Sequence, residues 1–146
     1  MDSIGSCSIR GVARRMTVVG LVLLATACSS GGGPSSGQTV VIDGQQVVVQ
    51  GTVDVGGQTA EDIDAKDYSF DPTVLSGSGG QTLTISIHNR GTATHNFSIP
   101  QQQISQDVAP GQSVTVTVTF PAFGQLPFFC RFHRNRGMLG ELRAGT

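Results

Sequence analysis

Three side chains that can bind a soft metal ion stand close together near the C-terminus of this 146-residue chain. They are the thiol of Cys130, the imidazole of His133 and the thioether of Met138, in the pattern Cys-x2-His-x4-Met. A sulfur ligand beside an imidazole suits copper, zinc or iron, and a thioether at a third position favours copper. The spacing therefore predicts that this loop supplies three ligands to one copper ion and that another part of the chain supplies a fourth.

His95 is the residue that we expect to complete this set. It stands at the start of a predicted strand, residues 95–99. His88 instead falls on an alternating strand, on the face opposite its apolar side chains, and is expected to face solvent. Two imidazoles and a thiolate around copper, with a distant thioether on the axis, are the ligands of a blue-copper electron-transfer site. Gly137 would let the chain turn so that Met138 points back toward the metal.

These four residues also have other interpretations. Alone, each could be an ordinary core or surface residue, but their joint occurrence in this order favours a metal site. A structural zinc site usually takes four Cys and His ligands, and the chain has no paired Cys or His spacing of that kind. Three histidines cannot build a type 1 centre and a second copper cluster. We therefore expect that the chain is not an enzyme.

The N-terminus predicts a signal peptide, residues 1–27, with three arginines before an apolar run over residues 17–27. The run is too short to cross a bilayer, which needs about 20 residues. The sequence Leu-Ala-Thr-Ala-Cys at 24–28 resembles a bacterial lipoprotein signal, in which Cys28 becomes the lipidated N-terminus, although Ala25 stands where Leu is usual. The alternative is an ordinary secretory signal cut near Ala27. After processing at Cys28, Cys130 is the one free thiol.

The rest of the chain predicts one all-β domain behind a tether. Residues 28–38 are a Gly- and Ser-rich tether, and residues 39–60 are a hairpin around Asp43-Gly44 or a linker. Residues 61–146 contain about seven or eight short strands, which is typical of a Greek-key β-sandwich. The clearest of the expected strands cover residues 66–72, 81–89, 95–99, 113–120, 127–130 and 138–143, with a polar connection and a possible edge strand in residues 100–107.

Charge is sparse and unevenly placed. Only 13% of the residues are charged and the formal net charge is -1, which gives no sign of nucleic-acid binding. Three arginines lie in the loop from Cys130 to Met138, and they either steer an acidic partner or simply keep the loop solvated. They are Arg131, Arg134 and Arg136. Four acidic residues cluster at the start of the main domain, namely Glu61, Asp62, Asp64 and Asp67.

These features together resemble the cupredoxins, the plastocyanin- and azurin-like small blue copper proteins, over about residues 65–144. The resemblance rests on Tyr68-Ser69-Phe70-Asp71-Pro72, Asn89, His95-Asn96-Phe97, Ala109-Pro110-Gly111 and Phe129-Cys130-x2-His133-x4-Met138-x-Gly140. It implies one type 1 copper site with His95, Cys130 and His133 as equatorial ligands and Met138 as the axial ligand. Asn96 would brace the Cys loop by hydrogen bonding, and His133 would be the electron exit. The loop is more basic than this family leads one to expect, and the connection from His95 to Cys130 is short.

The resemblance implies a monomeric one-electron carrier that cycles between Cu(I) and Cu(II). It would work at the bacterial cell envelope, outside the cytoplasm, with a lipid anchor on the membrane. Its partner would be a redox protein such as a cytochrome or an oxidase. The alternative is a copper-binding, storage or delivery protein that uses the same ligands and passes copper to an acceptor. A domain that keeps the fold only for protein contacts is a third possibility, against which the intact ligand set argues.

Overall fold

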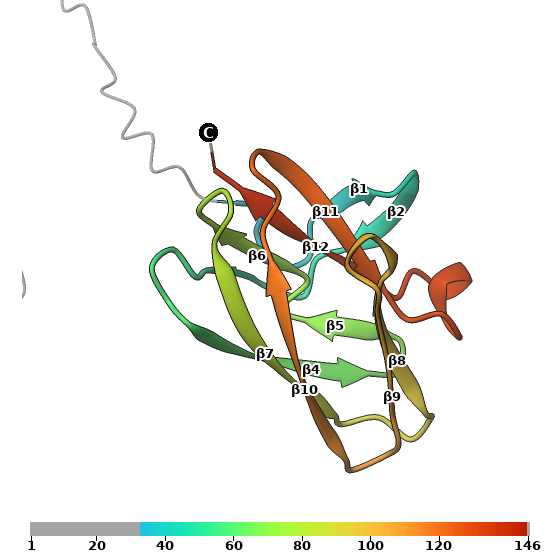
Figure 1. Cartoon of the computed structure of the whole chain (residues 1–146). Helices are drawn as coiled ribbons and strands as arrows, with labels where there is room; N and C mark the ends of the chain where they lie inside the picture. Colours follow the sequence, from blue (N-terminus) through green and yellow to red (C-terminus); the bar gives the residue numbers. More distant parts are fainter. Residues whose placement is uncertain (1–32, 146) are drawn as a thin grey trace, which may run out of the picture. The chain divides into compact units, whose positions relative to one another are not determined.

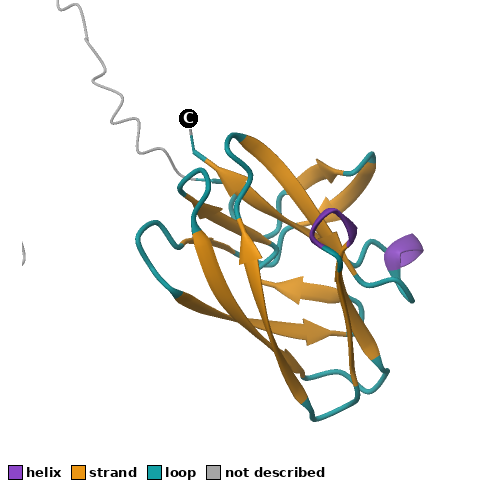
Figure 2. Cartoon of the chain, viewed as in Figure 1, coloured by secondary structure: helices purple, strands orange, loops and turns teal. Residues whose placement is uncertain are grey.

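The computed structural model describes residues 33–145, which form β-strands joined by short loops (Figures 1 and 2). The predicted signal peptide, the lipidation site at Cys28 and the first residues of the tether lie outside the described residues. No helix within residues 33–145 is long and apolar enough to cross a membrane. The strands are β1 Thr39–Ile42, β2 Gln45–Val48, β3 Thr52–Asp54, β4 Ala60–Lys66, β5 Ser69–Asp71, β6 Val74–Gly77, β7 Thr82–Asn89, β8 His95–Ile99, β9 Ile104–Val108, β10 Ser113–Thr119, β11 Gly124–Phe129 and β12 Leu139–Ala144. Two single-turn 3-10 helices, η1 Pro100–Gln102 and η2 Arg134–Arg136, complete these elements.

Two sheets pack face to face and confirm the predicted all-β sandwich. One sheet has the order β10-β7-β4-β5, and the other has the order β3-β6-β12-β11-β8-β9. Both contribute to one apolar core, in which the rings of Phe70, Phe97 and Phe128 lie 4.9–6.0 Å apart. Because Phe70 comes from one sheet and the other two rings from its partner, these aromatic contacts join the layers directly beside the metal loop.

Strict alternation correctly predicted the most regular pair of strands. Leu83, Ile85 and Ile87 of β7 are buried, and their neighbours on the strand are more exposed. β10 pairs antiparallel with β7, with Val116 opposite Ile85 and Val118 opposite Leu83. A period of two places such side chains on one face of a strand, so a half-buried strand is legible in the sequence.

The predicted strand over residues 66–72 is wrong as a single element. β4 ends at Lys66, the chain turns at Asp67 and Tyr68, and β5 returns antiparallel from Ser69. Alternation continues across this tight turn, so the pattern alone gives no sign of it. β4 also begins earlier than the expected strand, at Ala60, because parallel pairing with β7 buries Ile63.

The main domain holds more strands than expected. Nine strands, β4 to β12, lie between residues 60 and 144, against the seven or eight predicted. Three strands are additional to the six clearest expected ones. They are β5, which the turn at Asp67 separates from β4, then β6, and β9, which forms an edge of the six-stranded sheet. The suggested edge strand in the polar connection is thus confirmed.

The hairpin around Asp43-Gly44 forms β1 and β2 and packs on the domain. Asp43 and Gly44 have φ values of 49° and 76°, which a two-residue hairpin turn requires. Ile42 and Val47 are buried in a small cluster with Leu139 of β12. An isolated two-stranded hairpin is marginal in water, so this apolar contact accounts for its order.

We predict that Ile42→Ala lowers the free energy of unfolding by about 2–5 kcal/mol, because it leaves a cavity under the hairpin. Val41→Ala is the matched control, since Val41 is the neighbouring residue of the same strand and is 64% exposed. This control should change stability by less than about 0.5 kcal/mol. Chemical denaturation of both variants measures the difference. Equal effects would contradict the view that the hairpin is packed as part of the domain.

Candidate metal centre

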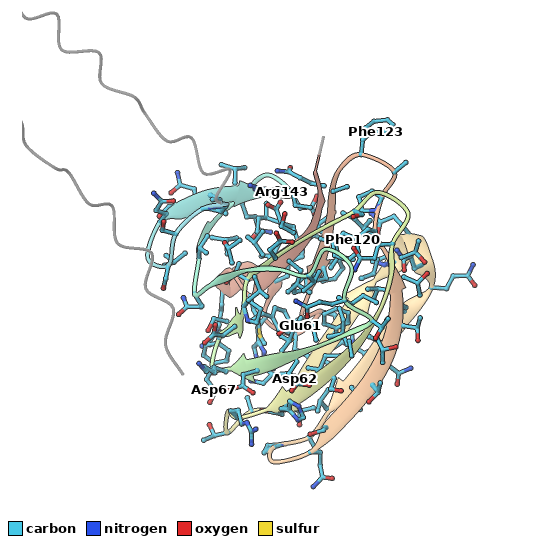
Figure 3. The ribbon with its side chains drawn as sticks, turned by 90° about the vertical axis from the view of Figure 1, so that its left-hand side faces the viewer. Glu61, Asp62, Asp67, Phe120, Phe123 and Arg143 are labelled. Carbon is cyan, nitrogen blue, oxygen red and sulfur yellow. The ribbon has the colours of Figure 1, made fainter. Side chains whose placement is uncertain are left out.

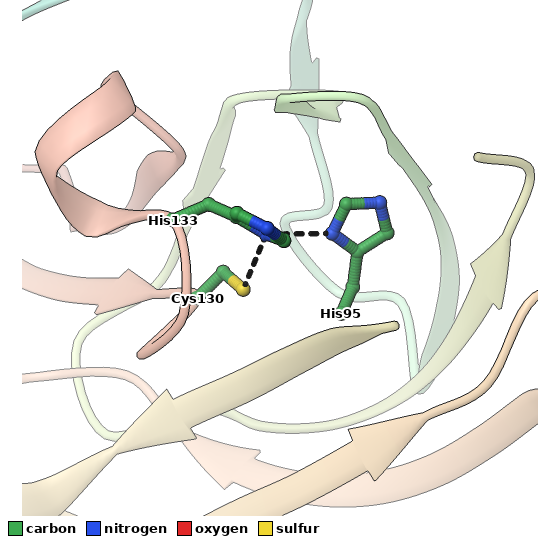
Figure 4. Close-up of side chains that lie close together, drawn as sticks. All are labelled: His95, Cys130 and His133. Atoms are coloured by element: carbon green, nitrogen blue, oxygen red, sulfur yellow. Dashed lines mark hydrogen bonds between the residues drawn. The ribbon is translucent and has the colours of Figure 1, made fainter. Parts of the chain in front are cut away.

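Two histidines and one cysteine from two segments of the chain lie close together (Figure 4). His95 begins β8, Cys130 directly follows β11, and His133 lies in the loop between β11 and β12. Nδ1 of His133 is 3.3 Å from Nδ1 of His95 and 3.4 Å from Sγ of Cys130. The three potential ligand atoms all lie within 4.8 Å of one another. Two imidazole nitrogens and one sulfur at this spacing can surround a single metal ion, and this donor set suits copper.

Backbone hydrogen bonds close the loop that carries Cys130, His133 and Met138. The N–H of Cys130 donates to the carbonyl of Met138 at 3.0 Å, and the N–H of Met138 donates to the carbonyl of His133 at 3.3 Å. Gly137 has a φ of 81°, which lies in the left-handed region. Glycine adopts this conformation without strain, so Gly137 allows the loop to turn at this position. Met138 is fully buried in the same core cluster as Cys130. The loop is therefore short, closed and anchored at both ends.

The sulfur of Cys130 is held from the neighbouring strand. Cys130 is fully buried, and its Sγ accepts the backbone N–H of Asn96 at 3.3 Å. The side chain of Asn96 accepts the N–H of Arg131 at 3.4 Å and donates to Asp107 at 2.7 Å. Asn96 thus contacts the Cys loop through both its backbone and its side chain.

The two histidines differ in exposure. His95 is fully buried, whereas His133 is partly exposed and its ring centroid lies 4.5 Å from that of Tyr68. Burial lowers the pKa of His133, and the nearby His95 and Arg136 lower it further. Neutral imidazole is the form that binds a metal, so these surroundings favour the form that the site requires.

The role of Asp67 is not apparent in the sequence, where this residue is one of an acidic group with Glu61, Asp62 and Asp64. Asp67, labelled in Figure 3, lies in the turn after β4. Its Oδ1 accepts a hydrogen bond from Nε2 of His95 at 2.8 Å. Hydrogen bonds from the backbone and hydroxyl of Thr92 hold the pKa of Asp67 well below its usual range. Nothing in the spacing of Asp67 marks this contact, because it depends on the unpredicted turn.

His88 lies apart from the metal-binding group. Its ring bonds to Ser113 at 2.6 Å and lies 3.5 Å from Asp62. His88 was expected not to be a ligand, and it is absent from the cluster of possible ligands among the described residues.

The three arginines of the loop mostly contact the chain's own side chains. Arg131 pairs with Asp107 at 2.6 Å, and Arg134 pairs with Asp43 of the hairpin turn. Arg136 lies over the ring of Tyr68, 4.4 Å from its centroid. The positive charge of two arginines is thus locally compensated, and both ion pairs link the loop to neighbouring elements.

Comparisons with known proteins agree with this architecture. The sequence matches the Cupredoxin-like domain family over residues 35–141, which is most of the chain and includes the hairpin. A comparison with curated protein sequences finds no match.

Three solved structures share the fold at low sequence identity. One is dithionite-reduced auracyanin from the photosynthetic bacterium Roseiflexus castenholzii, with 22% identity and a TM-score of 0.51, covering 61% of this chain and 98% of that one. Another is the metal-binding domain of the Cu(I)-exporting P-type ATPase CopA of Streptococcus pneumoniae with Cu(I), with 13% identity and a TM-score of 0.52, covering 64% and 97%. A third is auracyanin B, with 17% identity and a TM-score of 0.51, covering 76% and 97%. With the family match over most of its length, the chain belongs to the cupredoxin-like family, and His95, Cys130 and His133 form a candidate copper site within it.

Proposed function

We propose that this protein is a type 1 copper protein that carries one electron at a time. The observation that carries the proposal is the convergence of two imidazole nitrogens and one thiol within 4.8 Å, at a closed loop of a cupredoxin-like sandwich. Copper bound there would supply a Cu(I)/Cu(II) couple. The role of the protein is to hold the ligands in one geometry, so that little rearranges when an electron arrives.

Met138 is the proposed axial ligand. Its backbone is hydrogen-bonded to both Cys130 and His133, and its side chain is buried beside the loop. A weak axial thioether completes the ligand pattern of blue-copper sites, and its strength tunes the potential. Asn96 is proposed to fix the position of Cys130 through the contacts described above.

The proposed electron exit is the edge of His133 beside Phe132. Phe132 is 49% exposed and follows the buried Cys130 by two positions in the loop. A redox protein such as a cytochrome or an oxidase could approach this apolar edge. Because Arg131 and Arg134 are already paired with aspartates, we propose that they chiefly stabilise the loop rather than steer a partner.

The proposed working place is the cell envelope outside the cytoplasm. The support is the lipoprotein-like sequence ending at Cys28, followed by a Gly- and Ser-rich stretch. Lipid on Cys28 would hold the monomeric domain at the membrane surface.

The first expected result is that addition of copper(II) to purified protein gives an intense blue colour, because the thiolate of Cys130 bonds to the metal. Cys130→Ser should abolish this colour while the β-sheet circular dichroism is kept. His88→Asn is the control, and it should remain blue. Visible and EPR spectra check the prediction, and a colourless wild-type copper complex would contradict the proposal.

A second measurement separates electron transfer from copper delivery, which would use the same ligands. As an electron carrier, the reduced copper protein should be reoxidised by a cytochrome over many cycles while copper stays bound. A delivery protein would instead lose its copper to an apo-acceptor within the same time. Stopped-flow spectroscopy follows the first process, and metal analysis after gel filtration follows the second.

Met138→Leu tests the axial ligand. Leucine preserves the volume and apolar character of the buried side chain, so the fold should be kept. Loss of the thioether donor destabilises Cu(II) more than Cu(I), and we expect the potential to rise while the colour persists. Spectroelectrochemistry measures both, and an unchanged potential and spectrum would show that Met138 serves only in core packing.

A further inference from the structure

The buried histidine of the candidate copper site is bonded, through its remote nitrogen, to a carboxylate. We propose that Asp67 is a positioning residue for the copper centre, which orients His95 and lowers the reduction potential of the copper. This inference rests on the proposed function. Asp67 lies outside the ligand loop, so it is an additional residue that affects the reduction potential of the copper.

The geometry assigns the tautomer of His95. A carboxylate only accepts hydrogen bonds, so the 2.8 Å contact places the proton of the neutral ring on Nε2. Nδ1 then carries the lone pair, and this is the atom that faces His133 across 3.3 Å. The bond to Asp67 therefore directs the metal-binding nitrogen of His95 toward the candidate site.

Asp67 is itself held by the loop between β7 and β8. Its Oδ2 accepts both the backbone N–H and the hydroxyl of Thr92, at 2.8 and 2.7 Å. A Cβ on Gly91 would lie 2.2 Å from Oδ1 of Asp67 and 2.8 Å from Nε2 of His95. Only glycine leaves room for this approach, so the loop fits around the carboxylate and the imidazole together.

The charge of Asp67 acts on the metal through the ring. An anionic acceptor on Nε2–H makes the imidazole a stronger donor at Nδ1. A stronger donor and a nearby negative charge both stabilise Cu(II) more than Cu(I), because the oxidised ion carries the larger positive charge. The side chain of Asp67 is 25% exposed, so solvent screens the effect in part without removing it. The expected direction is a lower potential than the same site would have beside a neutral acceptor.

Two substitutions separate charge from orientation. Asp67→Asn keeps an oxygen that can accept Nε2–H but removes the charge, whereas Asp67→Ala removes both. Asp62→Asn is the matched control, because Asp62 lies on β4, the strand that directly precedes Asp67, has the same charge and is 75% exposed beside His88.

The copper-loaded proteins test the charge. Titration against a redox mediator should show the equilibrium constant for reduction of Asp67→Asn increased at least tenfold, which is 59 mV for one electron. Asp62→Asn should change it less than twofold. Equal changes in the two variants would overturn the proposal, because they would reflect net charge alone.

The apo-proteins test the orientation without copper. Long-range nitrogen–proton NMR spectra should show His95 of the wild type protonated at Nε2, and Asp67→Ala should lose this single tautomer. A wild-type ring protonated at Nδ1 would overturn the assignment. If the wild type bound no copper, the proposed function would be contradicted, and these spectra would still decide whether Asp67 orients His95.

Discussion

The pairing of β11 with β12 is the constraint on which the candidate site depends. The ladder runs to Phe129 opposite Leu139, and the hydrogen bond from Cys130 to Met138 continues it by one rung. The loop therefore has fixed ends and a fixed length. β8 lies beside β11, with Ser98 opposite Phe129, and this neighbour relation brings His95 and Asn96 to the sulfur. Because the ligands lie at the ends of paired strands, the pairing of these strands fixes their positions.

Polar contacts around the loop come from segments that are distant in the sequence. Arg131 reaches β9 and Arg134 reaches the hairpin turn, with partners 24 and 91 residues away. Exposed ion pairs contribute little to stability, about 0–1 kcal/mol each. Their effect here is better described as positional, because each pair joins the loop to a different element of the domain. This accounts for a loop that looks unusually basic in the sequence.

The burial of the two histidines gives the site an inner and an outer side. His95 is enclosed and bonded to Asp67, while His133 reaches partial exposure beside Tyr68. The inner histidine is thus the one whose surroundings the protein controls most fully. In the proposed function, the outer histidine is the electron exit, because it is the more exposed of the two. The difference in burial between the two histidines supports that proposal.

Local patterns in the sequence were enough to predict the sandwich, the hairpin turn and the residues that converge. Alternation in β7 and β10 reports burial on one face, and Asp43-Gly44 reports a tight turn, because both depend on near neighbours. His95, Cys130 and His133 can bind copper because of their imidazole and thiol groups, and these residue types are read directly from the sequence.

Only the tertiary structure decided what surrounds these residues. Alternation continued through the turn at Asp67, so residues 66–72 looked like one strand although they belong to two. The partner of Asp67 is 28 residues away in the sequence, and the fold brings it within hydrogen-bond distance. The docking of the hairpin and the aspartates that pair with the arginines depend on the same kind of long-range contact. Local patterns cannot report such pairs, because they form only when separate strands and loops pack together.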